Sequence, residues 1–218
     1  MKRRIYNYIF FTLLLSIESI AQQFTVDIGR NTTSFDYTNS EGESTLDLFS
    51  ENNFTYSVGY RKELNRLFHY HASLLLNKYS AFGSDQFNVN ELRWESSYTG
   101  IQIGMDAEVF KKKGFSFFLR AAGGPQFFVK GTQSINNESF SLKKVEQFDK
   151  PRLFVSPAIG FNYCSDSRVG VSLKYSYSKG FPLGTTDNEK LIINSSAFTI
   201  GLLWSLGDCD YCYIRNNR

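Results

Sequence analysis

Residues 169–178 read VGVSLKYSYS, and this short stretch decides the predicted fold. Every second side chain is apolar or aromatic, and the side chains between them are Gly, Ser and Lys. A period of two belongs to a β-strand that has one apolar face and one polar face. We therefore predict a strand whose two faces meet different surroundings.

The same alternation recurs in eight segments, and the gaps between them alternate between short and long. The predicted strands are 24–29, 54–61, 68–77, 92–109, 115–121, 153–163, 169–178 and 198–206. The short turns are 62–65, 111–114 and 165–167, whereas the long polar connections are 38–52, 80–91, 131–150 and 181–194. This alternation of short turns and long loops is typical of outer-membrane barrels. The predicted fold class is all-β: an eight-stranded antiparallel up-and-down transmembrane β-barrel with short periplasmic turns and long extracellular loops.

The first strand contains one irregularity. Its apolar residues occupy even positions up to Ile28, but Phe35 and Tyr37 occupy odd positions. A β-bulge inserts one residue and shifts the phase of the side chains after it. We therefore predict a bulge near Arg30.

The N-terminal segment predicts export. Lys2, Arg3 and Arg4 precede an apolar run at 9–15, and small residues precede a cleavage point after Ala21. A transmembrane helix needs about 20 apolar residues, so an uncleaved helical anchor is the weaker alternative. The predicted organisation is a signal peptide at 1–21, a barrel at 22–207 and a short periplasmic tail at 208–218.

Composition narrows the class of protein. Aromatic residues make up 17% of the chain although the mean hydropathy is only −0.29, as expected when apolar residues alternate with polar ones. The predicted signal peptide holds three of the 24 basic residues and one of the 21 acidic residues, so the remainder is nearly neutral. Domains that bind nucleic acid concentrate positive charge. We predict no nucleic-acid partner.

Side-chain size favours a membrane barrel over a soluble, lipocalin-like barrel with an apolar interior. The interior of an eight-stranded barrel is narrow, and the polar face carries mainly Gly, Ser, Ala and Thr. The bulky apolar face therefore points outward to lipid. Aromatic residues near strand ends predict girdles at the two membrane interfaces. The predicted girdle residues are Tyr60, Tyr79, Trp94, Tyr98, Phe115, Tyr163 and Trp204.

The signal, the eight alternating segments and the aromatic-rich last strand give the chain a family resemblance. It resembles the small outer-membrane β-barrel proteins of Gram-negative bacteria, such as OmpA-like and OmpX-like barrels. The resemblance implies outer-membrane localisation, contact with outer-membrane lipid and insertion by the barrel-assembly machinery. In that family an aromatic residue ends the closing strand and the protein, whereas here Trp204 and Leu206 precede a tail.

Charged residues on the polar face predict a network inside the barrel. Charges in a narrow lumen are costly unless they are paired, and this face carries acids, bases and two histidines. The predicted lumen network consists of Asp27, Arg61, His69, His71, Asp106, Glu108, Arg120 and Lys174. A metal site formed by the histidines and carboxylates is the weaker alternative. We predict neither a metal nor another cofactor.

Three cysteines lie at the predicted periplasmic side. They are Cys164, Cys209 and Cys212, and the oxidising periplasm favours one disulfide bond among them. The spacing of Cys209 and Cys212 is also that of a redox pair, but the helix that supports such a pair is missing. We predict a structural disulfide bond and one remaining cysteine, without choosing the pairing.

Sequence gives little support for catalysis. No Gly-rich phosphate loop precedes a credible helix, and serines are too common to define a Ser–His pair. We predict a structural or surface-binding outer-membrane protein that has no catalytic activity and whose loops contact an unidentified extracellular ligand. A narrow pore is the first alternative, because eight strands leave little open space. A membrane-embedded lipid hydrolase is the second alternative.

Overall fold

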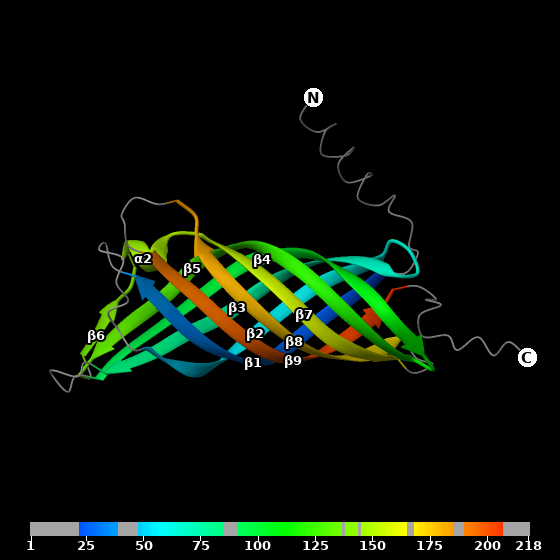
Figure 1. Cartoon of the computed structure of the whole chain (residues 1–218), viewed down its shortest axis with the longest axis horizontal. Coiled ribbons are helices and arrows are strands. Elements are labelled where there is room, and N and C mark those ends of the chain that lie inside the picture. Colours follow the sequence, from blue (N-terminus) through cyan, green and yellow to red (C-terminus); the bar gives the residue numbers. More distant parts are fainter. Residues whose placement is uncertain are drawn as a thin grey trace, which may run out of the picture.

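Eight long strands form a closed antiparallel barrel in the computed structural model (Figure 1). The structure describes residues 22–38, 48–84, 91–136, 138–143, 145–164, 168–184 and 190–206. The barrel strands are β1 (Gln22–Thr38), β2 (Leu48–Glu63), β3 (Phe68–Ser84), β4 (Glu91–Lys112), β5 (Phe115–Ile135), β7 (Arg152–Cys164), β8 (Val169–Pro182) and β9 (Lys190–Ser205). The predicted signal peptide at 1–21 and tail at 208–218 lie outside the described residues.

Antiparallel pairing runs around the whole barrel and closes between β1 and β9. The closing register runs from Gln23 opposite Ser205 to Thr38 opposite Lys190 without a shift. A short strand, β6 (Glu138–Ser141), pairs with the far end of β5, and a single helical turn, α2 (Glu146–Asp149), follows it. The strand pairing confirms the predicted eight-stranded up-and-down barrel.

In the described part of the chain, no helix is long and apolar enough to cross a membrane.

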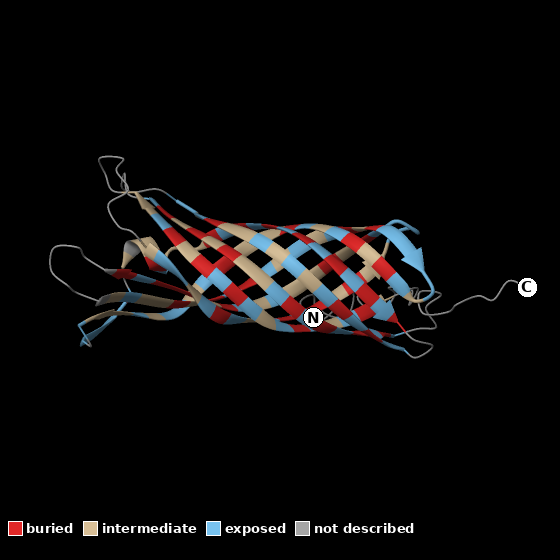
Figure 2. Cartoon of the chain, turned by 60° about the horizontal axis from the view of Figure 1, so that its bottom comes forward, coloured by how far each residue is buried: buried red, intermediate tan, exposed pale blue. Residues whose placement is uncertain are grey.

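Burial alternates along the barrel strands, as Figure 2 shows by its chequered colouring. In β7 every odd residue from Leu153 to Tyr163 is exposed and every even residue from Arg152 to Cys164 is buried. The exposed residues of the strands are largely Phe, Tyr, Leu, Ile and Val. A soluble barrel would bury such side chains, so the outward apolar face supports the transmembrane orientation.

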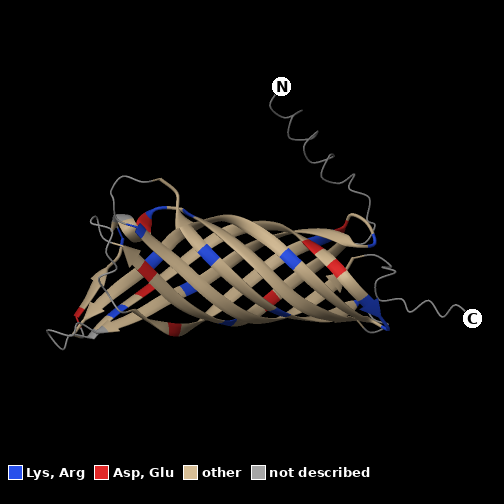
Figure 3. Cartoon of the chain, in the orientation of Figure 1, with Lys and Arg blue, Asp and Glu red and all other residues tan. Residues whose placement is uncertain are grey.

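Charged residues occur sparsely along the middle of the barrel and more densely at its ends (Figure 3). One end carries the turn between β4 and β5, where Lys113 and Gly114 both have positive φ. The other end carries β6 and α2 (Figure 1). We call these the turn end and the loop end.

The predicted bulge near Arg30 is wrong. The register of β1 against both of its neighbours is continuous through this position. Phe35 is 4% exposed and points inward like Asp27 and Asn31. The apolar phase changes because the interior itself becomes apolar toward the loop end, so an inward residue there is aromatic without any insertion in the backbone.

The strands are longer than the alternation predicted. The chain between β1 and β2 spans 39–47 rather than 38–52, and the chain between β3 and β4 spans 85–90 rather than 80–91. Strand β5 continues to Ile135, well beyond the predicted end at residue 121. At the loop end of β1 and β4 the outward side chains become polar, as at Thr32 and Arg93. In β5 the run 123–125, Gly-Gly-Pro, interrupts the alternation before the exposed Phe127 and Val129. Backbone pairing continues in both cases, so the alternation ends before the strands do.

Three predicted girdle residues are wrong. Tyr79 and Tyr98 are 1% and 0% exposed inside the barrel, and the partly buried Trp94 packs against an interior apolar cluster. The alternation of side chains explains why they point inward. On β3, Tyr79 follows His69 by an even number of residues and therefore lies on the same inward face. The other predicted girdle residues lie at the turn end: Phe115, Tyr163 and Trp204 are exposed, and Tyr60 contacts neighbouring aromatic rings.

The outward face gives a test that depends on depth. Leu173 lies outward in the middle of β8 and Val169 lies outward at its turn end. Leu173→Arg should lower the unfolding free energy by about 2–4 kcal/mol in a bilayer, whereas Val169→Arg should cost roughly 0–1 kcal/mol, because the cost of a cation falls toward the interface. Urea unfolding in liposomes measures both values. Equal costs would contradict the lipid-facing assignment.

Candidate functional site

The interior near the turn end is organised around a buried arginine. Arg61, from β2, is 1% exposed. Its Nε donates to Asp106 Oδ2 at 2.8 Å, Nη2 donates to Glu108 Oε1 at 2.9 Å, and Nη1 donates to Gln23 Oε1 at 3.0 Å. One guanidinium therefore links β1, β2 and β4 across the lumen.

A second arginine engages the same aspartate. Arg120 lies directly opposite Asp106 in the register of β4 and β5. Its Nε donates to Asp106 Oδ1 at 2.5 Å and its Nη2 donates to Asp106 Oδ2 at 2.8 Å. Such two-bonded arginine–carboxylate pairs are strong and fix geometry. Asp106 thus holds two guanidinium groups in the narrow lumen.

The two predicted histidines lie beside this cluster. His69 is buried opposite Asp106 in the register of β3 and β4. His71 places Nδ1 3.5 Å from Asp106 Oδ1. Among the described residues, no three His, Cys, Asp or Glu side chains are grouped to hold a metal ion. The carboxylate of Asp106 faces arginines, which repel a cation.

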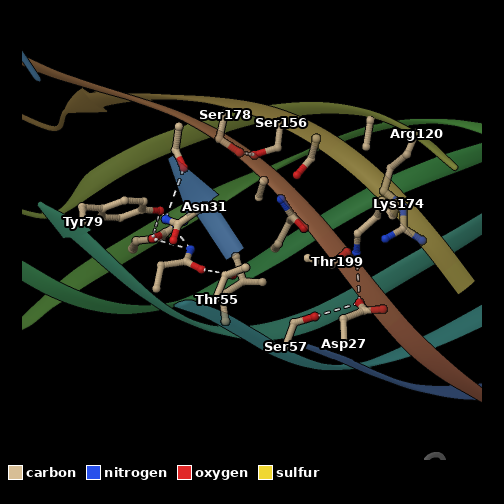
Figure 4. Close-up of a pocket in the computed structure, with 18 residues that line it drawn as sticks. Asp27, Asn31, Thr55, Ser57, Tyr79, Arg120, Ser156, Lys174, Ser178 and Thr199 are labelled. Carbon is tan, nitrogen blue, oxygen red and sulfur yellow. Dashed lines mark hydrogen bonds and ion pairs between the residues drawn. The ribbon is translucent and has the colours of Figure 1, made fainter. Parts of the chain in front are cut away.

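A separate ion pair lies deeper in the lumen (Figure 4). Lys174 Nζ donates to Asp27 Oδ2 at 3.0 Å, and Ser57 Oγ donates to the same oxygen at 2.9 Å. A Cβ atom on Gly201 would lie only 2.0 Å from Asp27 Oδ1. The absence of a side chain at Gly201 therefore makes room for the Asp27 carboxylate.

The structure brings together most of the predicted lumen network. Three acids, Asp27, Asp106 and Glu108, face three bases, Arg61, Arg120 and Lys174. With neutral histidines this set has no net charge. A buried ion without a partner lowers the stability of a fold strongly, and the pairing of acids with bases avoids this loss. Removal of one partner leaves the other charge buried and unpaired.

A small polar chamber separates the charged layer from the loop end. Its volume is about 50 Å³, and Ser, Thr, Asn and Gln side chains form most of its lining. Figure 4 shows Tyr79 at one end of the chamber, with Asp27, Lys174 and Arg120 at the other. The chamber has room for only a few water molecules.

Aromatic side chains cover the chamber on the loop side. The rings of Tyr79 and Phe154 stack with their centroids 5.4 Å apart. The ring centroid of Tyr98 lies 5.8 Å from that of Tyr79. Tyr79 Oη donates to Gln126 Oε1 at 3.0 Å and accepts a 2.9 Å bond from Asn77 Nδ2. The aromatic layer is thus packed and hydrogen-bonded.

Sequence reasoning missed several interior residues. Phe118 and Phe154 are 1% exposed, and the Phe118 ring covers Gly160 at 2.5 Å from its ideal Cβ position. Arg152 is fully buried. The parity of strands β5 and β7 contained the signal, because all three residues share the phase of the small inward residues. Phe118 and Phe154 are large and Arg152 is charged, so none of them resembles the small residues of that face.

Cys164 ends β7 at the turn end, where it is buried and disulfide-bonded. The other two cysteines of the prediction, Cys209 and Cys212, lie outside the described residues. The pairing stays a prediction.

A closed eight-stranded barrel with an apolar outside and a paired polar inside has the fold of the small outer-membrane barrels. No known family matches the sequence, and no curated protein is similar to it in sequence. Among solved structures, the outer membrane protein OprG from Pseudomonas aeruginosa has a TM-score of 0.51 at 10% identity, covering 85% of this chain and 96% of that chain.

Two further barrels are similar at lower scores. Neisserial surface protein A has a TM-score of 0.49 at 11% identity, covering 85% of this chain and 97% of that chain. The outer membrane protease OmpT from Escherichia coli has a TM-score of 0.48 at 8% identity, covering 88% of this chain and 99% of that chain. At these identities the likeness concerns the fold alone.

Two variants compare the stabilising effect of a buried ion pair with that of surface ion pairs. Arg120→Ala leaves part of the charge on Asp106 uncompensated, and we expect it to lower the unfolding free energy by about 3–5 kcal/mol. Arg93→Ala removes the exposed ion pairs with Glu51 and Glu95 and should cost less than about 1 kcal/mol. Urea unfolding in detergent micelles compares them. Similar losses would show that the lumen pair is no more important than a surface pair.

Proposed function

We propose that this protein is an integral outer-membrane barrel of structural or surface-binding type, with a closed lumen and no catalytic activity. One observation supports the proposal: two packed layers of side chains, which we call the plugs, lie in series in the narrow lumen. The Arg61–Asp106–Arg120 cluster lies toward the turn end and the Tyr79–Phe154 stack lies toward the loop end. We infer that each layer closes the lumen. A chamber of about 50 Å³ between them is too small for a solute path.

The outer face supports the proposed location and partners. Apolar side chains such as Ile103, Phe161 and Leu202 are more than half exposed around the barrel, and such a surface requires lipid. The proposal therefore includes outer-membrane lipid as the surroundings of the mature barrel and the barrel-assembly machinery as a transient partner. The turn end then faces the periplasm and the loop end faces the exterior.

The loop end is the part available to an extracellular partner. It carries β6 and α2, and it has the exposed charges Glu51, Arg93 and Glu95 joined in ion pairs. Binding sites in rigid scaffolds concentrate on such loop regions. The proposal therefore assigns binding to this end.

Single-channel recording tests the closed lumen. The wild-type protein in planar bilayers should show no stepwise currents. Tyr79→Ala and Arg120→Ala should each remain silent, because the other plug stays in place. A porin inserted into the same bilayers serves as the positive control. Reproducible current steps from the wild-type protein would overturn the closed-lumen proposal and favour the narrow pore.

Fractionation tests the location. The mature protein should appear in the outer-membrane fraction, and its migration on gels should change on heating, because a folded barrel resists unfolding by detergent at room temperature. The same preparation, heated and unheated, provides the control. Recovery in the soluble periplasmic fraction would contradict the membrane assignment.

A further inference from the structure

An apolar cavity of about 270 Å³ lies at the loop end, beyond the aromatic plug. Eight of its ten lining residues are apolar or aromatic, and none carries a charge. Barrel strands contribute Phe35, Trp94 and Leu191, and the segment between β6 and β7 contributes Leu142, Val145 and Phe148. The polar lining side chains are those of Gln133 and Gln147.

The part of the wall that holds Leu142, Val145 and Phe148 is joined to the barrel strands by hydrogen bonds. Leu142 N donates to Gly131 O at 3.0 Å. The hydroxyl of Tyr98 donates to Phe148 O at 2.8 Å. These bonds join the segment to β5 and β4, so the cavity is formed before any ligand arrives.

A buried arginine adds a third fastening. Arg152 Nη1 donates to Leu191 O at 2.7 Å, and its Nη2 donates to the carbonyl oxygen of Gln147. The guanidinium therefore joins two walls of the cavity, one from β9 and one from α2. A preformed site does not lose the ordering entropy that a flexible loop loses on binding.

The cavity has a buried floor and a more open mouth. Phe35, Phe148 and Leu191 are buried, whereas Tyr37, Leu48 and Trp94 are only partly buried. Water in such a space has few polar partners, and filling the space with an apolar molecule is favourable. We infer that a ligand enters on this partly buried side.

Size and charge narrow the ligand class. A dry apolar cavity of about 150 Å³ suffices for benzene, so 270 Å³ accommodates a molecule of about two fused rings. A charged ligand would lose its hydration without meeting an opposite charge in the lining. The two glutamine side chains allow one polar substituent.

We propose that this cavity binds a neutral bicyclic aromatic molecule, or an apolar molecule of equal bulk, from the exterior. The proposal deepens the surface-binding function, on which it rests, by naming the ligand class and the site. Trp94 lies in the lining, so occupancy should change its fluorescence.

Fluorescence quenching in detergent micelles tests the proposal. The chain has two tryptophans, and Trp204→Phe leaves Trp94 as the single reporter. Titration with 6-bromo-2-naphthol, whose bromine quenches tryptophan, should give saturable quenching. The charged analogue 6-bromo-2-naphthoate should bind at least tenfold more weakly.

Two substitutions of the same kind locate the site. In the Trp204→Phe background, Val145→Phe adds bulk inside the cavity and should raise the dissociation constant at least tenfold. Val129→Phe adds the same bulk at an exposed position of β5 and should change it less than twofold. Heat-modified migration verifies that each variant folds. If Val145→Phe does not fold, Leu48→Phe at the mouth replaces it.

Three outcomes would overturn the cavity assignment. Linear, unsaturable quenching that is equal in all variants would show that the probe only partitions into micelles. Saturable quenching that Val145→Phe leaves unchanged would place the ligand elsewhere, and equal affinity for the naphthoate would remove the preference for a neutral ligand. Channel currents bear on the closed lumen and fractionation bears on location, so failure of the proposed function is distinguishable from failure of this site.

Discussion

Closure of the sheet between β1 and β9 is the constraint on which the rest of this structure depends. A strand edge cannot face hydrocarbon, because each backbone group left without a hydrogen bond is costly there. The uninterrupted register between these two strands removes the edge. Once eight strands close, the lumen is narrow, and every inward side chain must fit beside inward side chains from the opposite wall.

The narrow lumen explains how its contents are arranged. Near the turn end, paired charges fill the space and satisfy one another, with Asp106 between Arg61 and Arg120. Farther along, small residues accommodate large ones, as where the Phe118 ring lies over Gly160. Each large inward group therefore requires a small or complementary neighbour, and the interior is packed rather than open.

The interior changes character along the barrel axis. Charged pairs give way to hydroxyl and amide groups, then to the Tyr79 and Phe154 rings, and finally to the apolar cavity at the loop end. The outward apolar face follows from the lipid, but the inward apolar cluster has another origin. It includes Leu142 and Phe148 from the segment between β6 and β7, with Val145 packed against it, and it lies on the loop side of the polar chamber.

Alternation along single strands was enough to predict the barrel, the outward apolar face and the inward position of residues such as Asp106 and Arg120. These properties depend on a period of two within one strand, which the chain displays directly. Tyr79 and Tyr98 were predicted as girdle residues from their aromatic character, although their positions in the alternation are those of the inward face. Only the tertiary structure decided which charges meet, since Asp27 and Lys174 are separated by 147 positions. It alone revealed that Arg152 donates to Leu191 O and that Tyr98 donates to Phe148 O, because these bonds join side chains to backbone carbonyls 39 and 50 positions away and leave no periodic pattern in the sequence.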